Sequence, residues 1–218
     1  MREFGSYFRT VLDGNLQGHL GSHAEAIGLH DLPWERLERL GRQWLRFGRA
    51  MNLSGARDFP ALAEQVAEGL EVVALAGRLG CVRGQRWIDI GSGAGFPGLI
   101  VAACLPVEVV LVEPRERRAA FLELMLGELG MVGRVVRGRL EVSGVQEGRR
   151  TLVERFEWAS ARAVFSPAEW IRRSQVLLVE EGITVVHLHA GDPDPPGHVA
   201  VAAIEGGKWS VRGYRCST

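Results

Sequence analysis

The chain has 218 residues, 46% of them hydrophobic, and its 26 acidic residues equal its 26 lysines and arginines. These values predict an ordinary globular domain. The zero formal charge excludes a global field toward nucleic acid or membranes, so such binding must depend on local patches. Three cysteines at no metal-ligand spacing (Cys81, Cys104 and Cys216) indicate a reducing compartment and no metal site. The first residues form no signal region and no apolar run reaches membrane-spanning length, so we expect a cytoplasmic protein with no membrane contact.

The first clear element is an amphipathic helix that we expect from Pro33 to about Arg49. Its apolar side chains fall on one side at about 100° per residue. The opposite side carries a stripe of arginines: Arg36, Arg39, Arg42, Arg46 and Arg49. Such a stripe could follow a phosphate backbone. The neighbouring Glu35 and Glu38 favour the alternative, which is a solvated helix face.

A second helix is expected from Pro60 to about Leu79, with Asp58 as its N-terminal cap. A short polar break, Met51-Asn52-Leu53-Ser54, separates it from the first helix. We expect residues 1–80 to form a helical N-terminal extension packed on the core. Residues 81–218 are expected to form the core domain as a single compact unit.

The most informative stretch runs from Trp87 to Gly98 and reads Trp-Ile-Asp-Ile-Gly-Ser-Gly-Ala-Gly-Phe-Pro-Gly. An apolar run typical of a buried parallel strand is followed by four glycines and then by an expected helix from Leu99 to Leu105. A glycine turn between a strand and a helix lets the backbone approach a ligand. Its last six residues fit the dinucleotide spacing G-x-G-x-x-G, so NAD is one candidate, and a tight turn without a ligand is another. Asp89, however, precedes Gly91 by two residues, and a carboxylate there suits an ammonium group better than a pyrophosphate. This frame resembles the first motif of S-adenosylmethionine (AdoMet) methyltransferases.

A second carboxylate follows the next strand. The apolar run from Val107 to Val112 predicts a buried strand that ends in Glu113, 22 residues after Gly91. In a strand–helix–strand unit this spacing places the carboxylate at the tip of the neighbouring strand, where it can accept hydrogen bonds from both ribose hydroxyls. The alternative is an exposed loop acid.

The remaining chain alternates helices and strands and ends in a hairpin. The expected elements are a helix from Arg115 to Gly130, a strand at Val135-Val136, a strand from Phe156 to Ala161, a helix from Pro167 to Leu178, a strand from Ile183 to Leu188, and a hairpin of His198–Ile204 and Trp209–Arg215 joined by Gly206-Gly207. Together with the two earlier strands, this order predicts an α/β, Rossmann-like fold. Its sheet would have seven mostly parallel strands, with N-terminal helices and a C-terminal hairpin.

Four stretches carry a family resemblance. They are Gly91–Leu99 with its Phe-Pro-Gly continuation, Asn52-Leu53-Ser54 with Arg57-Asp58, Arg117-Arg118 with Phe121-Leu122, and Ala161-Arg162-Ala163. From about Pro33 to Leu188 the chain resembles the bacterial small-subunit (16S) ribosomal RNA guanine-N7 methyltransferases, also called glucose-inhibited division protein B. The resemblance implies a class I AdoMet-dependent methyltransferase.

The resemblance also implies that AdoMet and its product S-adenosylhomocysteine bind at the glycine turn. The predicted cofactor residues are Asp89, Gly91, Gly93, Phe96, Glu113, Leu140, Glu141 and Arg162. Leu140-Glu141 stands where methyltransferases of this class commonly hold the adenine ring. Guanine N7 has a lone pair and carries no proton, so catalysis by positioning requires no general base, and no catalytic residue is assigned.

The implied substrate is ribosomal RNA or the 30S subunit, bound by a monomer. Candidate RNA contacts are Arg117, Arg118, Asn52 and His189. Helix-surface arginines without a ligand are the alternative for the first two. Phe165 and Trp170 could stack on an exposed guanine, although their spacing is more typical of core residues.

The substrate half of the family pattern is altered in this chain. Where the family carries a histidine and an aspartate, this chain reads Gln65-Val66-Ala67-Glu68-Gly69, and Leu188-His189-Ala190 replaces leucine-lysine-glycine. The helix before the hairpin is reduced to Gly191–Gly197. Three functions therefore stay open: a ribosomal RNA guanine-N7 methyltransferase, an AdoMet methyltransferase retargeted to another substrate, and a non-catalytic protein that binds AdoMet or RNA.

Overall fold

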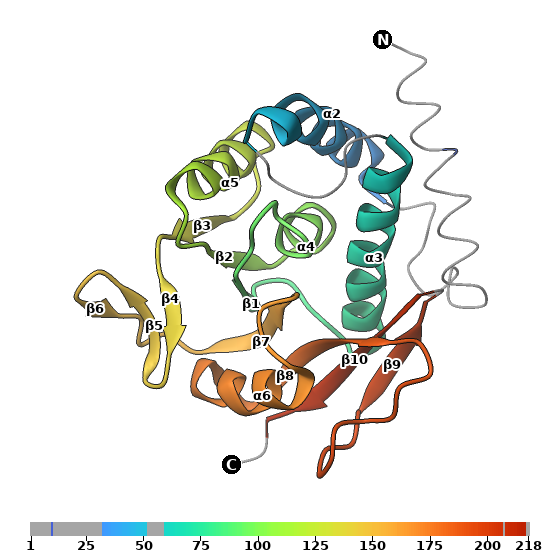
Figure 1. The fold of residues 1–218 in the computed structure, drawn as a ribbon, viewed down its shortest axis with the longest axis vertical. Coiled ribbons are helices and arrows are strands. Elements are labelled where there is room, and N and C mark those ends of the chain that lie inside the picture. Colours follow the sequence, from blue (N-terminus) through green and yellow to red (C-terminus); the bar gives the residue numbers. More distant parts are fainter. Residues whose placement is uncertain (1–9, 11–31, 52–58, 207, 217–218) are drawn as a thin grey trace.

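The computed structural model describes residue 10 and residues 32–51, 59–206 and 208–216. A seven-stranded sheet runs through the molecule in the order β3-β2-β1-β7-β8-β10-β9 (Figure 1). Its strands are β1 (Arg86–Ile90), β2 (Glu108–Val112), β3 (Gly133–Val136), β7 (Phe156–Ala161), β8 (Leu178–His189), β9 (Ala202–Glu205) and β10 (Trp209–Arg215). The first five strands in this order are parallel, and β10 pairs antiparallel with both β8 and β9. The predicted seven-stranded plan is confirmed.

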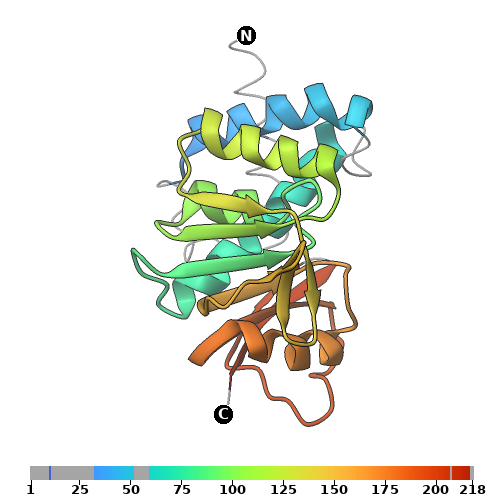
Figure 2. The same cartoon turned by 90° about the vertical axis from the view of Figure 1, so that its left-hand side faces the viewer.

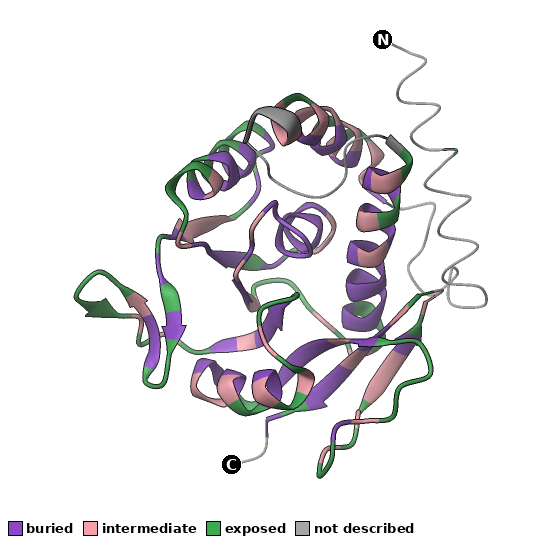
Figure 3. Cartoon of the chain, in the orientation of Figure 1, coloured by how far each residue is buried: buried purple, intermediate pink, exposed green. Residues whose placement is uncertain are grey.

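Helices cover both faces of the sheet because side chains alternate between the faces along each strand. They are α2 (Trp34–Met51), α3 (Phe59–Arg78), α4 (Gly98–Cys104), α5 (Glu116–Glu128) and α6 (Pro167–Ser174). Trp87, Val109 and Val185 point to the face that packs against α2, α3, α4 and α5. Ile88 and Val110 point to the other face, which packs against α6. Figure 3 shows the central strands and the inner sides of α3 and α4 as buried.

The structure has α6 start at Pro167 as predicted but differs from the predicted boundaries at its C-terminal end. The helix ends at Ser174, a 3₁₀ turn covers Gln175–Leu177, and β8 starts at Leu178 instead of Ile183. Leu178 pairs with Phe156, and a register shift between Phe156 and Trp158 accommodates the extra residues. The exposed Glu180 and Glu181 in this part of the strand resemble a loop in sequence, because their side chains lie outside the core.

Two further differences concern the hairpins. Instead of His198, the ninth strand begins at Ala202, because Asp194 ties the preceding loop to the backbone N–H of Ala200 (3.0 Å) and to the Tyr214 hydroxyl (2.6 Å). A small separate sheet of β4 (Arg139–Glu141), β5 (Gly144–Glu147) and β6 (Arg150–Thr151) was not predicted, since its strands are too short for a periodic pattern.

Helix α2 covers the outer side of α4 and α5, and it lies beside α5 in both views (Figures 1 and 2). Two arginines of the predicted stripe hold it there. Arg36 donates to the Ala103 carbonyl of α4 (2.9 Å), and Arg39 donates to the Glu128 carbonyl of α5 (2.8 Å). Carbonyls at helix C-terminal ends lack intrahelical partners and carry partial negative charge. These two arginines therefore have structural contacts that the sequence did not predict, while Arg39 is also exposed, as expected for a solvated helix face.

The predicted domain division stays a prediction. Helices α2 and α3 belong to the proposed extension, but their buried side chains, such as Leu40 and Leu70, join the same hydrophobic cluster as the sheet residues. Among the described residues, no helix is long and apolar enough to cross a membrane.

Trp44 connects α2 to the glycine turn. Its indole N–H donates to the Ala94 carbonyl (2.6 Å), and its ring stacks on Phe96 at a centroid distance of 4.3 Å. The Trp44 side chain is buried, so this hydrogen bond is shielded from water. A residue far away in sequence thus helps to fix the shape of the turn.

We expect Trp44→Phe to lower the free energy of unfolding by about 1–3 kcal/mol, because the Ala94 carbonyl is left buried without a donor. Urea denaturation followed by far-UV circular dichroism measures this change. Trp209→Phe is the matched control. Trp209 lies at the start of β10 and stacks on His189, which is not part of the glycine turn. Equal stability of Trp44→Phe and the unchanged protein would contradict the assigned role of this hydrogen bond.

Candidate functional site

The glycine turn follows β1 and precedes α4, at the carboxyl edge of the parallel strands. Gly91 and Gly93 have φ values of 71° and 57°, a left-handed region that favours glycine. A Cβ atom on Gly91 would lie only 2.6 Å from the Val164 side chain. Side chains are therefore disfavoured at these two glycines, where the backbone lines the adjoining cavity.

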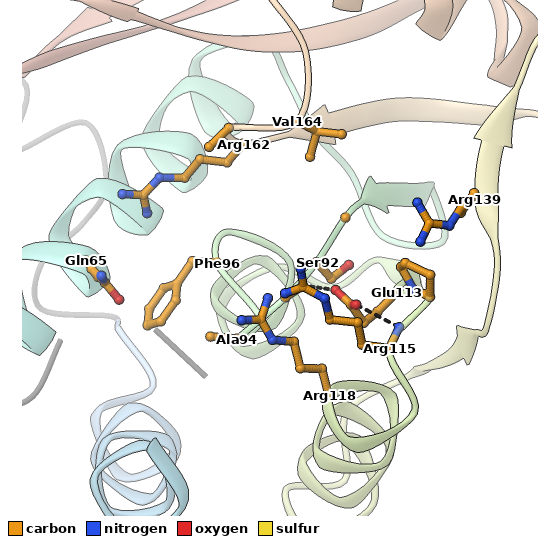
Figure 4. Close-up of a pocket in the computed structure, with 14 residues that line it drawn as sticks. Gln65, Ser92, Ala94, Phe96, Glu113, Arg115, Arg118, Arg139, Arg162 and Val164 are labelled. Carbon is orange, nitrogen blue, oxygen red and sulfur yellow. Dashed lines mark hydrogen bonds between the residues drawn. The ribbon is translucent and has the colours of Figure 1, made fainter. Parts of the chain in front are cut away.

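Glu113 holds the turn from the neighbouring strand. Its carboxylate is buried at the end of β2 and accepts hydrogen bonds from the backbone N–H groups of Gly93 and Arg115, each at 2.9 Å. Figure 4 shows both bonds as dashed lines. Each carboxylate oxygen has a second lone pair, and Glu113 lines the adjoining cavity. The same group can thus shape the turn and accept hydrogen bonds from a ligand.

Two adjoining cavities lie over this edge of the sheet. The larger one has a volume of about 600 Å³ and extends from Glu113 past the glycine turn to Gln65 and Arg162. The smaller one, about 230 Å³, is a mostly apolar slit between Val112 and Leu140. Both share four lining residues: Gly91, Pro114, Arg139 and Val164. Together they join a mostly apolar cavity to a larger one with a mixed lining that includes several charged side chains, a combination that suits a nucleoside with a charged extension.

Seven of the eight predicted cofactor residues line these cavities. Gly91, Gly93, Phe96, Glu113 and Arg162 line the larger one, whereas Leu140 and Glu141 line the slit. Asp89 is the exception. Its carboxylate lies beneath the turn, where Oδ1 accepts a hydrogen bond from Ser160 (2.7 Å) and Oδ2 is buried. Burial raises the pKa of Asp89 to about 6, although hydrogen bonds from Ser160 and Ser92 lower it.

The predicted RNA contacts are not brought together as one cluster. Arg118 lines the cavity, and a Cβ atom on Gly93 would lie 3.6 Å from its Nη1 atom, whereas Arg117 is exposed outside the cavity. His189 stacks on Trp209 (4.3 Å) at the end of β8 and lines neither cavity. Asn52 lies outside the described residues. The idea that Trp170 stacks on a guanine was wrong, because this ring is buried and donates to the Val185 carbonyl (2.9 Å).

Several cavity residues were missed by the sequence analysis. They are Ser92, Ala94, Pro114, Arg115, Arg139, Ala163 and Val164, and Gln65 had been noted only as a departure from a family pattern. Most of them stand next to a predicted site residue in the sequence, and this position was the signal that could have identified them. Gln65 comes from α3 and has no such signal, because only the packing of α3 against the sheet brings it to the cavity.

Charged side chains beneath α3 surround one end of the larger cavity. Arg162, at the end of β7, forms an ion pair with Glu68 of α3. Burial, and then the nearby Glu68, raise the pKa of Glu71 to about 8. Burial, followed by the positive charge of Arg162, lowers the pKa of His187 to about 3. At neutral pH the Arg162–Glu68 pair therefore supplies the charges of this cluster. Among the described residues, no group of histidines, cysteines and carboxylates could hold a metal ion.

We expect Glu113→Gln to weaken AdoMet binding at least several-fold, a loss of about 1.5–3 kcal/mol for charge-assisted hydrogen bonds. A glutamine has one acceptor oxygen, and its amide nitrogen would face a backbone N–H group. Isothermal titration calorimetry measures the dissociation constant. Glu116→Gln is the matched control, because Glu116 is exposed on the first turn of α5 and pairs with Arg137. Unchanged affinity for Glu113→Gln would mean that the carboxylate does not contact the cofactor.

Comparisons with known proteins agree on the fold and the family. A putative methyltransferase, yhhF, from Escherichia coli matches 68% of this chain and 85% of its own, with a TM-score of 0.52 and 16% identity. A methyltransferase from Pyrococcus furiosus matches 84% of this chain and 99% of its own, with a TM-score of 0.51 and 12% identity. At these identities the likeness concerns the fold, which is that of the class I AdoMet methyltransferases.

Sequence relatives are closer. The ribosomal RNA small subunit methyltransferase G of Mycobacterium avium is 45% identical over 114 residues, which cover 52% of this chain and 44% of that protein. The protein of the same name from Wolinella succinogenes is 38% identical over 106 residues, covering 48% and 52%. The chain thus spans about half the length of the curated relatives it matches. The model of the GidB family, described as rRNA small subunit methyltransferase G, matches residues 34–192, and the chain therefore belongs to this family.

Proposed function

We propose that the protein transfers a methyl group from AdoMet to N7 of a guanine in small-subunit (16S) ribosomal RNA. The observation that carries this proposal is the joined cavity, in which the glycine turn and Glu113 lie where the mostly apolar slit meets the larger cavity with its charged side chains. Membership of the GidB family supports the reaction and the RNA substrate. We extend the proposal to a monomer that acts in the cytoplasm on ribosomal RNA or on the 30S subunit.

The residues present fit the cofactor. The slit beside Leu140 and Phe165 offers apolar walls to an adenine ring, and Glu141 at its edge offers acceptor oxygens for polar groups of the nucleoside. Glu113 faces the position of a ribose and has lone pairs left for its hydroxyls. Arg118 lines the larger cavity beside the glycine turn and would attract the carboxylate of the methionine part.

The role of the protein in this chemistry is to position the reactants. When bound, AdoMet supplies a methyl group on a positively charged sulfur, and the guanine N7 lone pair forms the new carbon–nitrogen bond as the carbon–sulfur pair returns to sulfur. No proton leaves N7, so this chain needs no general base. Its residues have to hold the base in line with the methyl group and keep the turn rigid.

We expect the protein to place label from radioactive AdoMet on small-subunit particles from a strain that lacks this modification. Mapping by reduction and aniline cleavage should locate the label at N7 of one guanine. Label on another base or atom would support the retargeted methyltransferase. Firm AdoMet binding without any transfer would support the non-catalytic alternative.

We expect Arg117→Gln to lower RNA affinity and to reduce the slope of log affinity against log salt by about one unit, because one phosphate contact is lost. Arg117 is exposed beside the cavity-lining Arg115 and Arg118, so AdoMet affinity should not change. Arg83→Gln is the matched control, since Arg83 is exposed before β1 at the opposite edge of the sheet. Equal salt slopes for both variants would remove Arg117 from the RNA-binding surface.

A further inference from the structure

Among the described residues, Gln65 is the one residue of α3 that lines the larger cavity. It lies on α3 and lines the larger cavity but not the slit. In Figure 4 its amide lies beside the Phe96 ring, on the opposite side of the cavity from Glu113 and Arg139. If the slit holds adenine and Glu113 faces the ribose, the end with Gln65 and Arg162 is where the methyl group and its acceptor meet.

The amide oxygen of Gln65 lacks a donor. Its Oε1 atom is buried and has no hydrogen-bond partner among the described residues. Native proteins rarely leave such an atom unsatisfied, and the exceptions are often explained by a group that binds there. The Arg162 guanidinium, which lines the same cavity, is engaged in the ion pair with Glu68. A donor carried by the acceptor base would satisfy the Gln65 oxygen.

We propose that Gln65 selects the target base, with its amide nitrogen donating to guanine O6 and its amide oxygen accepting from guanine N1–H. A primary amide presents one donor and one acceptor side by side, which matches the adjacent O6 and N1–H groups of guanine. Adenine presents the reverse order, an amino group at C6 and an acceptor at N1. Because O6 also neighbours N7, the same contact would orient N7 toward the methyl donor. This inference rests on the proposed function.

The surrounding charges suit a base that becomes positively charged when N7 is methylated. The Gln65 amide is neutral, and the Arg162 charge is balanced by Glu68, one turn along the same helix. The buried His187 has a pKa lowered to about 3 and is neutral at physiological pH. The acceptor end of the cavity therefore carries no unbalanced positive charge from Arg162 or His187 that would oppose the product.

The test compares Gln65→Met with the matched control Glu64→Met, since Glu64 is exposed on the preceding position of α3. Three quantities are measured: AdoMet affinity by calorimetry, thermal unfolding, and kcat/KM for methyl transfer to 30S subunits. We expect Gln65→Met to keep AdoMet affinity within about twofold and to lose about 10-fold or more in kcat/KM, because two base contacts are removed. Glu64→Met should match the unchanged protein in all three.

Gln65→Glu is the second variant and applies if the methionine variant does not fold. It keeps the side-chain shape but loses the donor to O6, so we expect the same selective loss of kcat/KM. A kcat/KM within about twofold of the unchanged protein for these variants would overturn the proposal. A parallel loss of AdoMet affinity would also overturn it, because Gln65 would then contact the methionine part of the cofactor. If the unchanged protein binds AdoMet but modifies no guanine, the proposed function itself fails.

Discussion

The buried carboxylate of Glu113 is the group on which the rest of the site depends. It accepts the N–H of Gly93 from the turn and the N–H of Arg115 from the start of the next helix. These two bonds connect the turn after β1, the end of β2 and the start of α5 at the carboxyl edge of the sheet. Trp44 holds the same turn from the other side through the Ala94 carbonyl. A turn that glycine makes flexible is thus held in one conformation, which lowers the entropy cost of binding a ligand there.

The arginines of this chain differ in what they contact. Arg36 and Arg39 each donate a hydrogen bond that holds α2 against the C-terminal ends of α4 and α5, although Arg39 is also exposed. Arg115 and Arg117 are exposed near the cavity at the start of α5. The chain has no net charge, so only such a local group can attract phosphate.

The cluster at α3 shows how a partly buried cation is retained in the wall of the larger cavity. Removing charges from water is costly unless they are paired. Arg162 is paired with Glu68, and burial favours the neutral form of Glu71, whose pKa is raised to about 8. The cluster connects α3 to the end of β7, so the position of Gln65 depends on the same contacts.

The sequence by itself determined the seven-stranded α/β plan and many of the residues that line the two cavities. The glycine pattern after β1 and Glu113 after β2 are local signals, because each residue lies next to the strand end that positions it. The same holds for Leu140 and Arg162, which line the cavities as the family resemblance implied.

Only the tertiary structure decided which distant residues complete the site and which predicted ones leave it. Gln65 enters the cavity and Arg36 turns away to a helix end because of how α2 and α3 pack on the sheet. Asp89 follows the expected motif, yet its strand directs the carboxylate beneath the turn toward Ser160. Side-chain direction and helix packing depend on contacts between residues far apart in the chain, and a periodic pattern in one segment does not contain that information.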